Sequence, residues 1–190
     1  MKVNTTRFGD LEVDKKDIIT FKEGLLGFDN LKKFFIVDPG DQTLILWFQS
    51  IEDASTAFPI IEPKIFQPHY SVKLLPAEMA SLNLESLGDA SVYTILTIPE
   101  VVTDMSANLK APIIINNQTK LARQIVLQDS KLEVRFKMYM DLKKYIVNFN
   151  ASDDSRRTYV QPINGQAANE ESVQETTVNN GNKLPKSPEA

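Results

Sequence analysis

The chain has 190 residues, 42% of them apolar and 24% charged, and a formal net charge of −4. This length and composition predict one globular domain of the soluble class with a further segment, not two full domains. The acidic balance argues against a general grip on nucleic-acid phosphates, and the absence of cysteine excludes disulfides, thiolate zinc sites and cysteine nucleophiles.

The start of the chain does not resemble an export signal. Residues 1–17 lack the apolar core of about 7–15 residues that a secretory leader carries. No window approaches the roughly 18 apolar residues that a membrane span needs. We therefore expect a cytoplasmic protein with no membrane association.

Short β-branched and aromatic segments bounded by turn residues predict strands through most of residues 1–150. The predicted strands are 17–21, 33–38, 43–49, 56–61, 91–98, 112–116 and 122–128. Residues 38–41, "DPGD", predict a turn between two of them, because proline presets φ and glycine relaxes the next position.

One helix is predicted over 76–88, from Pro76 in its first turn to Gly88 at its C-terminal cap, with Met79, Leu82 and Leu87 on one stripe. Residues 63–70 contain two prolines and predict an irregular turn. Residues 131–140 alternate apolar and polar side chains and predict a half-buried strand. Many short strands with one or two short helices favour a mostly β fold, an antiparallel barrel or sandwich.

The composition changes near Asn150. The last 40 residues contain few sizeable apolar side chains, and these are Tyr159, Val160, Ile163, Val173, Val178 and Leu184. So few groups do not offset the entropy lost on ordering forty residues. We predict a domain over 1–150 and a disordered polar tail over 151–190, for which partner binding is the alternative role.

The sequence offers little for catalysis. His69 is the only histidine, and nothing in the sequence places an orienting partner or a nucleophile beside it, as a hydrolase would need. Several acidic residues lie near the ends of predicted strands, where acids typically form turns, and no run resembles an EF-hand loop. They are Asp38, Glu52, Asp53, Glu62, Asp104 and Asp129. We predict no enzymatic activity, no cofactor and no metal site.

A second class of function is an RNA-binding module built on aromatic and lysine-bearing strands. Residues 24–27 form a Gly-x-x-Gly pattern, which clamps RNA backbone in KH domains, but here it follows a strand and favours a turn. Lys32 and Lys33 add only two charges. The aromatic side chains that would stack bases lie in apolar contexts, which favours core positions; they are Phe34, Phe35, Trp47 and Phe48.

Four longer motifs together resemble the flagellar assembly factor family, FliW. They are "FKEGLLGF" (21–28), "FQSIEDASTAFPIIEP" (48–63), "VYTILTIPE" (92–100) and "SANLKAPIIINNQTKLARQIVLQD" (106–129). The last is the most specific of the four. The chain departs from the family at Leu26, where a proline is frequent, and in its long tail. The resemblance does not cover the tail.

The resemblance implies a compact β-barrel-like monomer that regulates the flagellar filament protein without catalysis. Such a protein binds newly made flagellin in the cytoplasm. Once flagellin is exported, the free factor binds the translational repressor CsrA, which then loses its hold on flagellin messenger RNA. The implied partners are therefore flagellin and CsrA, with no direct contact to nucleic acid.

Asparagines and prolines near strand ends, together with two phenylalanines, are the predicted partner-binding positions, because amides pair with partner backbone and prolines leave strand edges unpaired. They are Phe58, Pro59, Pro63, Phe66, Asn108, Pro112, Asn116 and Asn117. The alternative assigns the asparagines and the phenylalanines to the fold itself. Asn108 would cap its own turn, Asn116 and Asn117 would form a hairpin connection, and the phenylalanines would be core.

Overall fold

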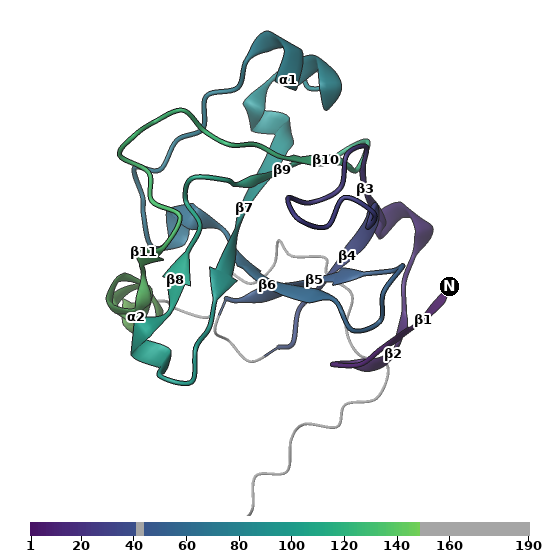
Figure 1. Ribbon diagram of the computed structural model, residues 1–190, viewed down its shortest axis with the longest axis horizontal. Helices are drawn as coiled ribbons and strands as arrows, with labels where there is room; N and C mark the ends of the chain where they lie inside the picture. Colours follow the sequence, from purple (N-terminus) through teal and green to yellow (C-terminus); the bar gives the residue numbers. More distant parts are fainter. Residues whose placement is uncertain (41–43, 149–190) are drawn as a thin grey trace, which may run out of the picture.

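Seven strands close into a barrel in the computed structural model, which describes residues 1–40 and 44–148 (Figure 1). They are β3 (Ile19–Phe21), β4 (Lys33–Val37), β5 (Leu46–Ser50), β6 (Ala57–Ile61), β7 (Ala90–Thr97), β9 (Ile113–Asn116) and β10 (Leu121–Gln124). The sheet runs in the order β7-β6-β5-β4-β3-β10-β9, and pairing of β9 with β7 closes it. The predicted mostly β, barrel-like fold is confirmed; the predicted tail, 151–190, lies outside the described residues.

One pair of neighbouring barrel strands is parallel. β10 runs parallel to β3, with Leu121 opposite Thr20, whereas the other neighbours in the ring are antiparallel. Strand directions cannot alternate around a ring with an odd number of members. A seven-stranded barrel therefore needs at least one parallel contact, and here it lies between β3 and β10.

Aromatic side chains fill the barrel interior. The rings of Phe34 and Phe48 stack with centroids 4.7 Å apart, and Phe21 meets both edge-on. Aliphatic side chains from neighbouring strands complete this cluster; they include Ile19, Leu46, Ile60, Ile113 and Ile115. Because side chains alternate across a strand, the residues between these point outward and need a second layer to cover them.

An N-terminal hairpin covers the outer face of β4 and β5. It consists of β1 (Lys2–Thr5) and β2 (Gly9–Glu12), and its Leu11 packs with the outward-pointing Phe35 and Val37. Both faces of β4 are thus buried, which explains its uninterrupted apolar sequence. The strands of this hairpin are short and mostly polar, so the sequence pattern does not predict them.

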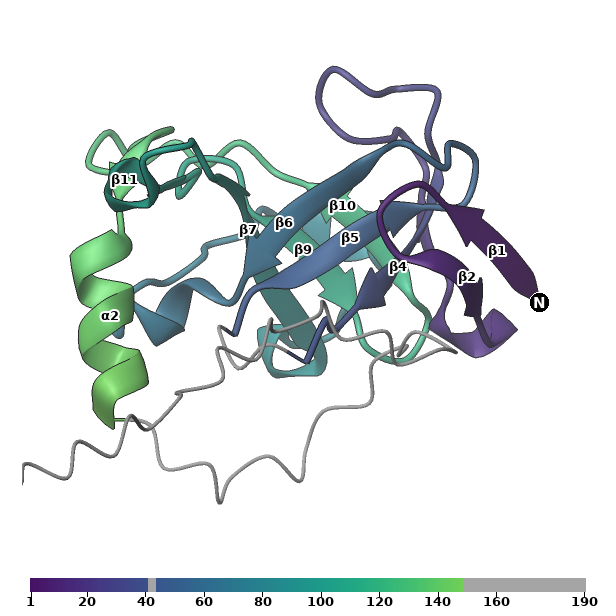
Figure 2. The same ribbon diagram turned by 90° about the horizontal axis from the view of Figure 1, so that it is seen from below.

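A larger cover lies over β7, β9 and β10 and buries the outward-pointing Ile114. Its elements are η2 (Pro63–Ile65), α1 (Pro76–Ser81), η4 (Val102–Asp104), β8 (Ser106–Ala107), β11 (Phe136–Lys137) and α2 (Tyr139–Asn148). Figures 1 and 2 both place α2 and β11 at the end of the molecule opposite the N-terminal hairpin. Two further 3₁₀ turns are η1 (Lys15–Asp17) and η3 (Leu87–Asp89).

The predicted helix over 76–88 is shorter than expected. α1 ends at Ser81 because Asn83 adopts a left-handed conformation (φ 54°). The N–H of Asn83 donates to the carbonyl of Ala80 and that of Leu84 to the carbonyl of Met79, which is the Schellman termination. Gly88 is therefore not the cap of α1 but a member of η3.

The predicted strand over 131–140 is mostly wrong. Only Phe136–Lys137 pairs, with β8, and α2 begins at Tyr139. Val134 and Met140, assigned to the buried face, are 59% and 63% exposed. The backbone of this segment serves other contacts: the carbonyl of Glu133 accepts from Leu109 and Lys110, and the carbonyl of Met138 accepts the first helical bonds of α2. Alternation of residue types alone did not reveal these contacts.

No helix among residues 1–40 and 44–148 is long and apolar enough to cross a membrane.

Candidate partner-binding surface

The β3–β4 loop, residues 22–32, projects from one end of the barrel (Figure 2). It contains two glycines at positive φ, Gly24 (82°) and Gly27 (81°). Between them the chain folds back on itself, so that the N–H of Phe28 donates to the carbonyl of Leu25. The sequence "GLLGF" therefore encodes a compact turn, as the Gly-x-x-Gly pattern predicted, in place of a nucleic-acid clamp.

Gly24 and Gly27 differ in the space around them. A Cβ on Gly24 would lie 2.7 Å from the carbonyl oxygen of Phe28 and 2.8 Å from the Cα of Asp29, whereas a Cβ on Gly27 would meet nothing within 4 Å. We expect Gly24→Ala to lower the free energy of unfolding by at least about 2 kcal/mol and Gly27→Ala by about 1 kcal/mol. Urea unfolding of both variants measures the difference. Equal losses would contradict the close backbone approach at Gly24.

The turn buries some apolar side chains and exposes others. Leu25 and Leu31 are buried in the barrel cluster, while Leu26 is 56% exposed and Phe28 38% exposed. The ring of Phe28 meets the ring of Phe58, on β6, edge-on with centroids 4.9 Å apart. We call Leu26, Phe28 and Phe58 the Leu26 patch. Apolar side chains displayed by a fixed loop are typical of a protein-binding surface.

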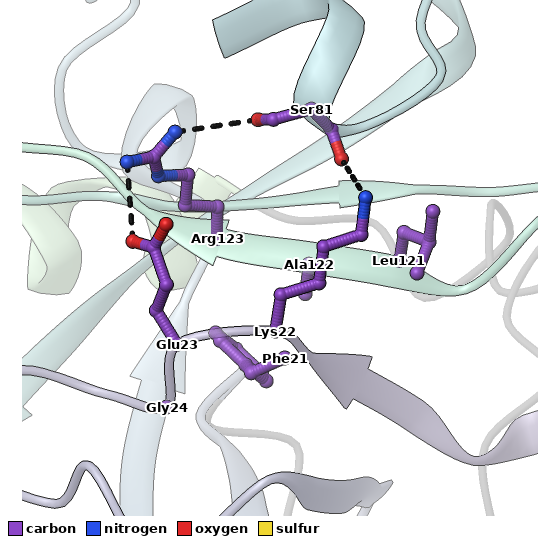
Figure 3. Close-up of a pocket in the computed structure, with 8 residues that line it drawn as sticks. All are labelled: Phe21, Lys22, Glu23, Gly24, Ser81, Leu121, Ala122 and Arg123. Carbon is purple, nitrogen blue, oxygen red and sulfur yellow. Dashed lines mark hydrogen bonds and ion pairs between the residues drawn. The ribbon is translucent and has the colours of Figure 1, made fainter.

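Side-chain contacts fix the base of the loop, as Figure 3 shows. Glu23 forms an ion pair of 3.1 Å with Arg123 of β10, and the Arg123 guanidinium also lies 3.4 Å from the Ser81 hydroxyl. The ammonium of Lys22 donates to the Ser81 carbonyl at 3.1 Å. These contacts join the loop to β10 and α1. The ion pair itself is exposed and adds little stability, so its effect is positional.

Two more contacts hold the tip and the far end of the loop. The Leu26 N–H donates to the Gln124 side-chain oxygen (3.0 Å), and the Gln124 amide donates to the Ala111 carbonyl. One carboxylate oxygen of Glu52 accepts from the backbone N–H groups of both Lys32 and Lys33 (2.6 and 2.9 Å). The Leu26 patch therefore sits on a loop held at its base, tip and end.

The β5–β6 connection that carries Glu52 is itself ordered by short-range hydrogen bonds. The Ser50 hydroxyl accepts from the N–H groups of Glu52 and Asp53. The Asp53 carboxylate accepts hydrogen bonds from the Thr56 hydroxyl and from the N–H and hydroxyl of Ser55. These bonds, the one from Thr56 most of all, hold the pKa of the Asp53 carboxyl below its usual value. The polar residues of "FQSIEDAST" thus build a turn that positions the neighbouring loop.

Four of the predicted binding residues lie on β6 and in the turn after it. Phe58 and Pro59 are half-buried on β6, and Phe58 belongs to the Leu26 patch. Pro63 is buried in η2, and the Phe66 ring, 4% exposed, packs against Phe136. Pro63 and Phe66 thus offer a partner little side-chain surface.

The other four predicted residues lie in two further places. Asn108 accepts the Ala111 N–H with its side chain and so closes the turn between β8 and β9, next to the buried Pro112. Asn116 is 3% exposed and bonds to backbone groups on both sides, whereas the exposed Asn117 accepts from the Ser91 hydroxyl. The structure does not gather the eight residues into one surface, and their role in binding stays a prediction.

Sequence reasoning missed Leu26 and Phe28 as surface residues. Their signal was present: two apolar side chains flank the second glycine of a turn too short to bury all of its apolar residues.

The aromatic side chains of the RNA-binding alternative are unavailable to bases. Phe34, Phe35 and Phe48 are fully buried. Trp47 is half-buried, and the Arg7 guanidinium carbon lies 3.6 Å from the centroid of its ring. With three of the four rings buried and Arg7 lying over the fourth, these strands lack the stacking platform of single-strand binding modules.

Among the described residues, His69 and a carboxylate, the pair that the hydrolase alternative requires, do not form a hydrogen-bonded site either. His69 is exposed, and its side chain makes no hydrogen bond or ion pair in the part of the chain that the structure describes. Within that same part, no three His, Cys, Asp or Glu residues are grouped so as to hold a metal ion.

Comparison with known proteins decides the family. The family model described as "FliW protein" matches residues 2–138. The chain belongs to the FliW family. It is 41% identical over 147 residues to the flagellar assembly factor FliW of Bdellovibrio bacteriovorus, covering 77% of this chain and 84% of the relative. With the factor from Syntrophus aciditrophicus it shares 38% identity over 136 residues, or 72% and 86% of the two chains.

A solved structure supports the same assignment for the fold. The crystal structure of a flagellar assembly factor FliW superimposes with a TM-score of 0.69 at 30% identity, covering 73% of this chain and 97% of that one. The region matched by the family model, residues 2–138, thus includes the barrel, the N-terminal hairpin, the β3–β4 loop and the larger cover except α2. The family is named for flagellar assembly and not for a catalysed reaction.

Proposed function

We propose that this FliW-family protein is a non-enzymatic, cytoplasmic regulator that exchanges two protein partners. Bound to flagellin, it holds the filament protein before export. Released from flagellin, it binds the repressor CsrA and relieves repression of flagellin messenger RNA. In this scheme it contacts no nucleic acid and is a monomer when unbound.

The Leu26 patch is the observation that carries the proposal. An exposed leucine and phenylalanine on a loop held at three points give a partner an apolar surface that needs little ordering on binding. Segments of filament proteins that are apolar on one face have a natural receptor in such a surface. We assign the patch to flagellin contact.

Charge gives weaker support for the second partner. Residues 1–150 carry 19 acidic and 17 basic side chains, so the domain has only a small acidic excess. A basic RNA-binding protein such as CsrA gains encounter rate from a local acidic surface rather than from this net charge. The exposed acidic residues of the β3–β4 loop are Glu23, which is paired with Arg123, and Asp29 next to Phe28.

Substitution in the patch tests the proposal. We expect Leu26→Asp to weaken flagellin binding by about 10-fold or more, because a buried carboxylate without a partner is costly at an apolar contact. Thermal unfolding of the variant should remain near wild type, since Leu26 is 56% exposed. Isothermal titration with purified flagellin, with CsrA, and with each in competition provides the measurement.

Val134→Asp is the matched control, because Val134 is 59% exposed and lies outside the β3–β4 loop. It should bind both partners as the wild type does. Failure of the wild type to bind either partner would remove the proposal. Direct RNA binding with a steep salt dependence would instead favour the nucleic-acid alternative.

A further inference from the structure

A groove of about 460 Å³ lies between two extended segments of the larger cover, far along the chain from each other. One wall consists of five consecutive residues, 125–129, that follow β10. The other consists of Ser71, Lys73 and Leu75, ahead of α1. Neither wall belongs to an assigned strand, although both have the side-chain pattern of one.

The first wall continues β10 beyond Gln124 and pairs with only one neighbouring segment among the described residues. The N–H groups of Ile125 and Leu127 donate to the carbonyls of Pro112 and Lys110 (3.0 and 2.9 Å), which continues the β9–β10 ladder past its assigned end. Ile125 and Leu127 are buried, while Val126 and Gln128 are exposed. This is the alternation of a half-buried edge strand.

Backbone groups on the outer edge of this strand are unpaired. Consecutive residues of a strand direct their N–H and C=O groups to opposite edges. Since Ile125 and Leu127 pair with Pro112 and Lys110, the backbone groups of Val126 and Gln128 point to the other edge. Among the described residues no acceptor meets either N–H, and the Val126 carbonyl accepts only the side-chain amide of Gln128, at 3.4 Å. Such an edge is a template for another strand.

The groove runs along this edge. Neighbouring side chains of a strand point to opposite faces, so a hollow touched by each of five consecutive residues must contact the backbone edge as well as one face. Opposite it, Ser71, Lys73 and Leu75 are exposed while Val72 and Leu74 pack into the cover. The N–H groups of residues 71–74 donate no hydrogen bond within the described chain, so no ladder joins the two walls.

The groove is apolar with an acidic bias. Leu75 and Val126 are 65% and 48% exposed, and both line it. Two carboxylates, Glu78 and Asp129, line it against a single ammonium, Lys73. Each carboxylate accepts one backbone N–H, from Leu75 and Lys131, and neither forms an ion pair with a described residue. An occupant that carries a basic side chain complements this charge.

We propose that the groove binds an extended segment of a protein partner, which adds a strand to the edge at Val126 and Gln128. Its N–H and C=O groups pair with those of the two residues, one apolar side chain packs between Leu75 and Val126, and a lysine or arginine meets Glu78 or Asp129. Backbone pairing supplies affinity in such strand addition, and the side-chain contacts supply selectivity. This surface is distinct from the Leu26 patch, and the choice of partner rests on the proposed function.

The edge is tested by removing one N–H from it. Val126→Pro removes the outward N–H and leaves both N–H donors to Pro112 and Lys110 in place, and Val126→Ala is the control that keeps the N–H. Both variants of the full 190-residue chain are titrated with flagellin and with CsrA. We expect the proline variant to bind one of them at least about 10-fold more weakly than the alanine variant does. Circular dichroism checks that both variants are folded.

Amide hydrogen exchange on the ¹⁵N-labelled wild type gives a second readout that does not depend on substitution. The Val126 and Gln128 amides should exchange fast in the free protein and slowly with the partner bound. The Ile125 and Leu127 amides should be slow in both states, because they already donate to Pro112 and Lys110.

Several outcomes overturn the inference. If Val126→Pro and Val126→Ala bind flagellin with equal affinity and CsrA with equal affinity, strand addition is contradicted and the proposed function is unaffected. Slow amide exchange at Val126 and Gln128 before any partner is added also contradicts strand addition by a partner, because a second copy or another segment of this chain would then fill the groove.

If the wild type binds neither flagellin nor CsrA, the proposed function fails. The groove is then tested separately by adding the peptide Lys-Val-Thr-Val-Thr-Val-Lys as a model strand. Slowed exchange at the Val126 and Gln128 amides on adding this peptide supports strand addition. Unchanged exchange there at millimolar peptide overturns it.

Discussion

Replacing Phe34 by alanine is expected to lower the free energy of unfolding by about 3–5 kcal/mol. The side chain is fully buried and contacts three other rings: it stacks on Phe48 at 4.7 Å, meets Phe21 edge-on at 5.6 Å and lies 6.4 Å from Phe58. Strands on all sides of a closed barrel limit how far the neighbours can move into the cavity. The transfer cost and the cavity cost therefore add.

Urea unfolding followed by Trp47 fluorescence measures this loss, since Trp47 is the only tryptophan. Phe28→Ala is the matched control, because Phe28 touches the same aromatic group through Phe58 but is 38% exposed. We expect the control to lose about 1 kcal/mol. Similar losses for the two variants would mean that the barrel interior tolerates the missing ring, in conflict with the packing described.

Replacing Asn116 by alanine is expected to cost about 2–4 kcal/mol. Its side-chain amide donates to the carbonyls of Leu82 and Asn83, and its side-chain oxygen accepts from the N–H groups of Gln118 and Thr119. The first two bonds join the β9–β10 hairpin to the residues that end α1, and the other two close the turn between β9 and β10. Alanine would leave buried backbone groups without partners, which is the main cost.

Asn117→Ala provides the comparison, because Asn117 is exposed and its one side-chain bond is to the Ser91 hydroxyl. We expect a change within about 0.5 kcal/mol for this variant. Thermal and urea unfolding give the stabilities, and titration with flagellin and CsrA at a temperature where both variants are folded gives the affinities. An Asn116 variant of normal stability with lost binding would restore the partner-contact role that the sequence suggested.

Asn116 and Asn117 show that a residue predicted to bind a partner can instead stabilise the fold. An amide at a strand end serves equally well for pairing with a partner or for closing a turn, and the sequence offers both uses. Which use applies depends on what the chain brings near it. Here Leu82 and Asn83, which end the turn after α1 more than thirty residues earlier, supply two acceptors for Asn116, whereas the Leu26 side chain stays 56% exposed.

Several elements followed from local sequence because local interactions decide them. The apolar runs "KFFIV" and "IIIN" are buried on both faces, and runs of this kind at strand length predict strands whatever the topology. The turn at residues 24–27 also followed from its glycines. The four long motifs identified the family for the same reason, since they are properties of the chain itself and the family comparison bears them out.

Other elements did not follow, and the reasons differ. The N-terminal hairpin is polar except for the few side chains that meet Phe35 and Val37, so its strands carry little signal of their own. The segment 131–140 alternates like a strand, but its backbone is used to hold the turn before β9 and to begin α2. The early end of α1 is set by Asn83, whose left-handed conformation is stabilised by the contacts of the residues after it.

The sequence by itself determined the class of this protein: a mostly β domain of the FliW family without the residues of a thiolate or histidine-cluster site. Those conclusions depend on residue types and on periodicity, which the chain carries locally. The tertiary structure alone decided which surfaces are left for partners, namely the Leu26 patch and the unpaired edge at Val126 and Gln128. Whether a side chain or backbone group is free depends on groups far away in sequence, and only folding brings those groups together.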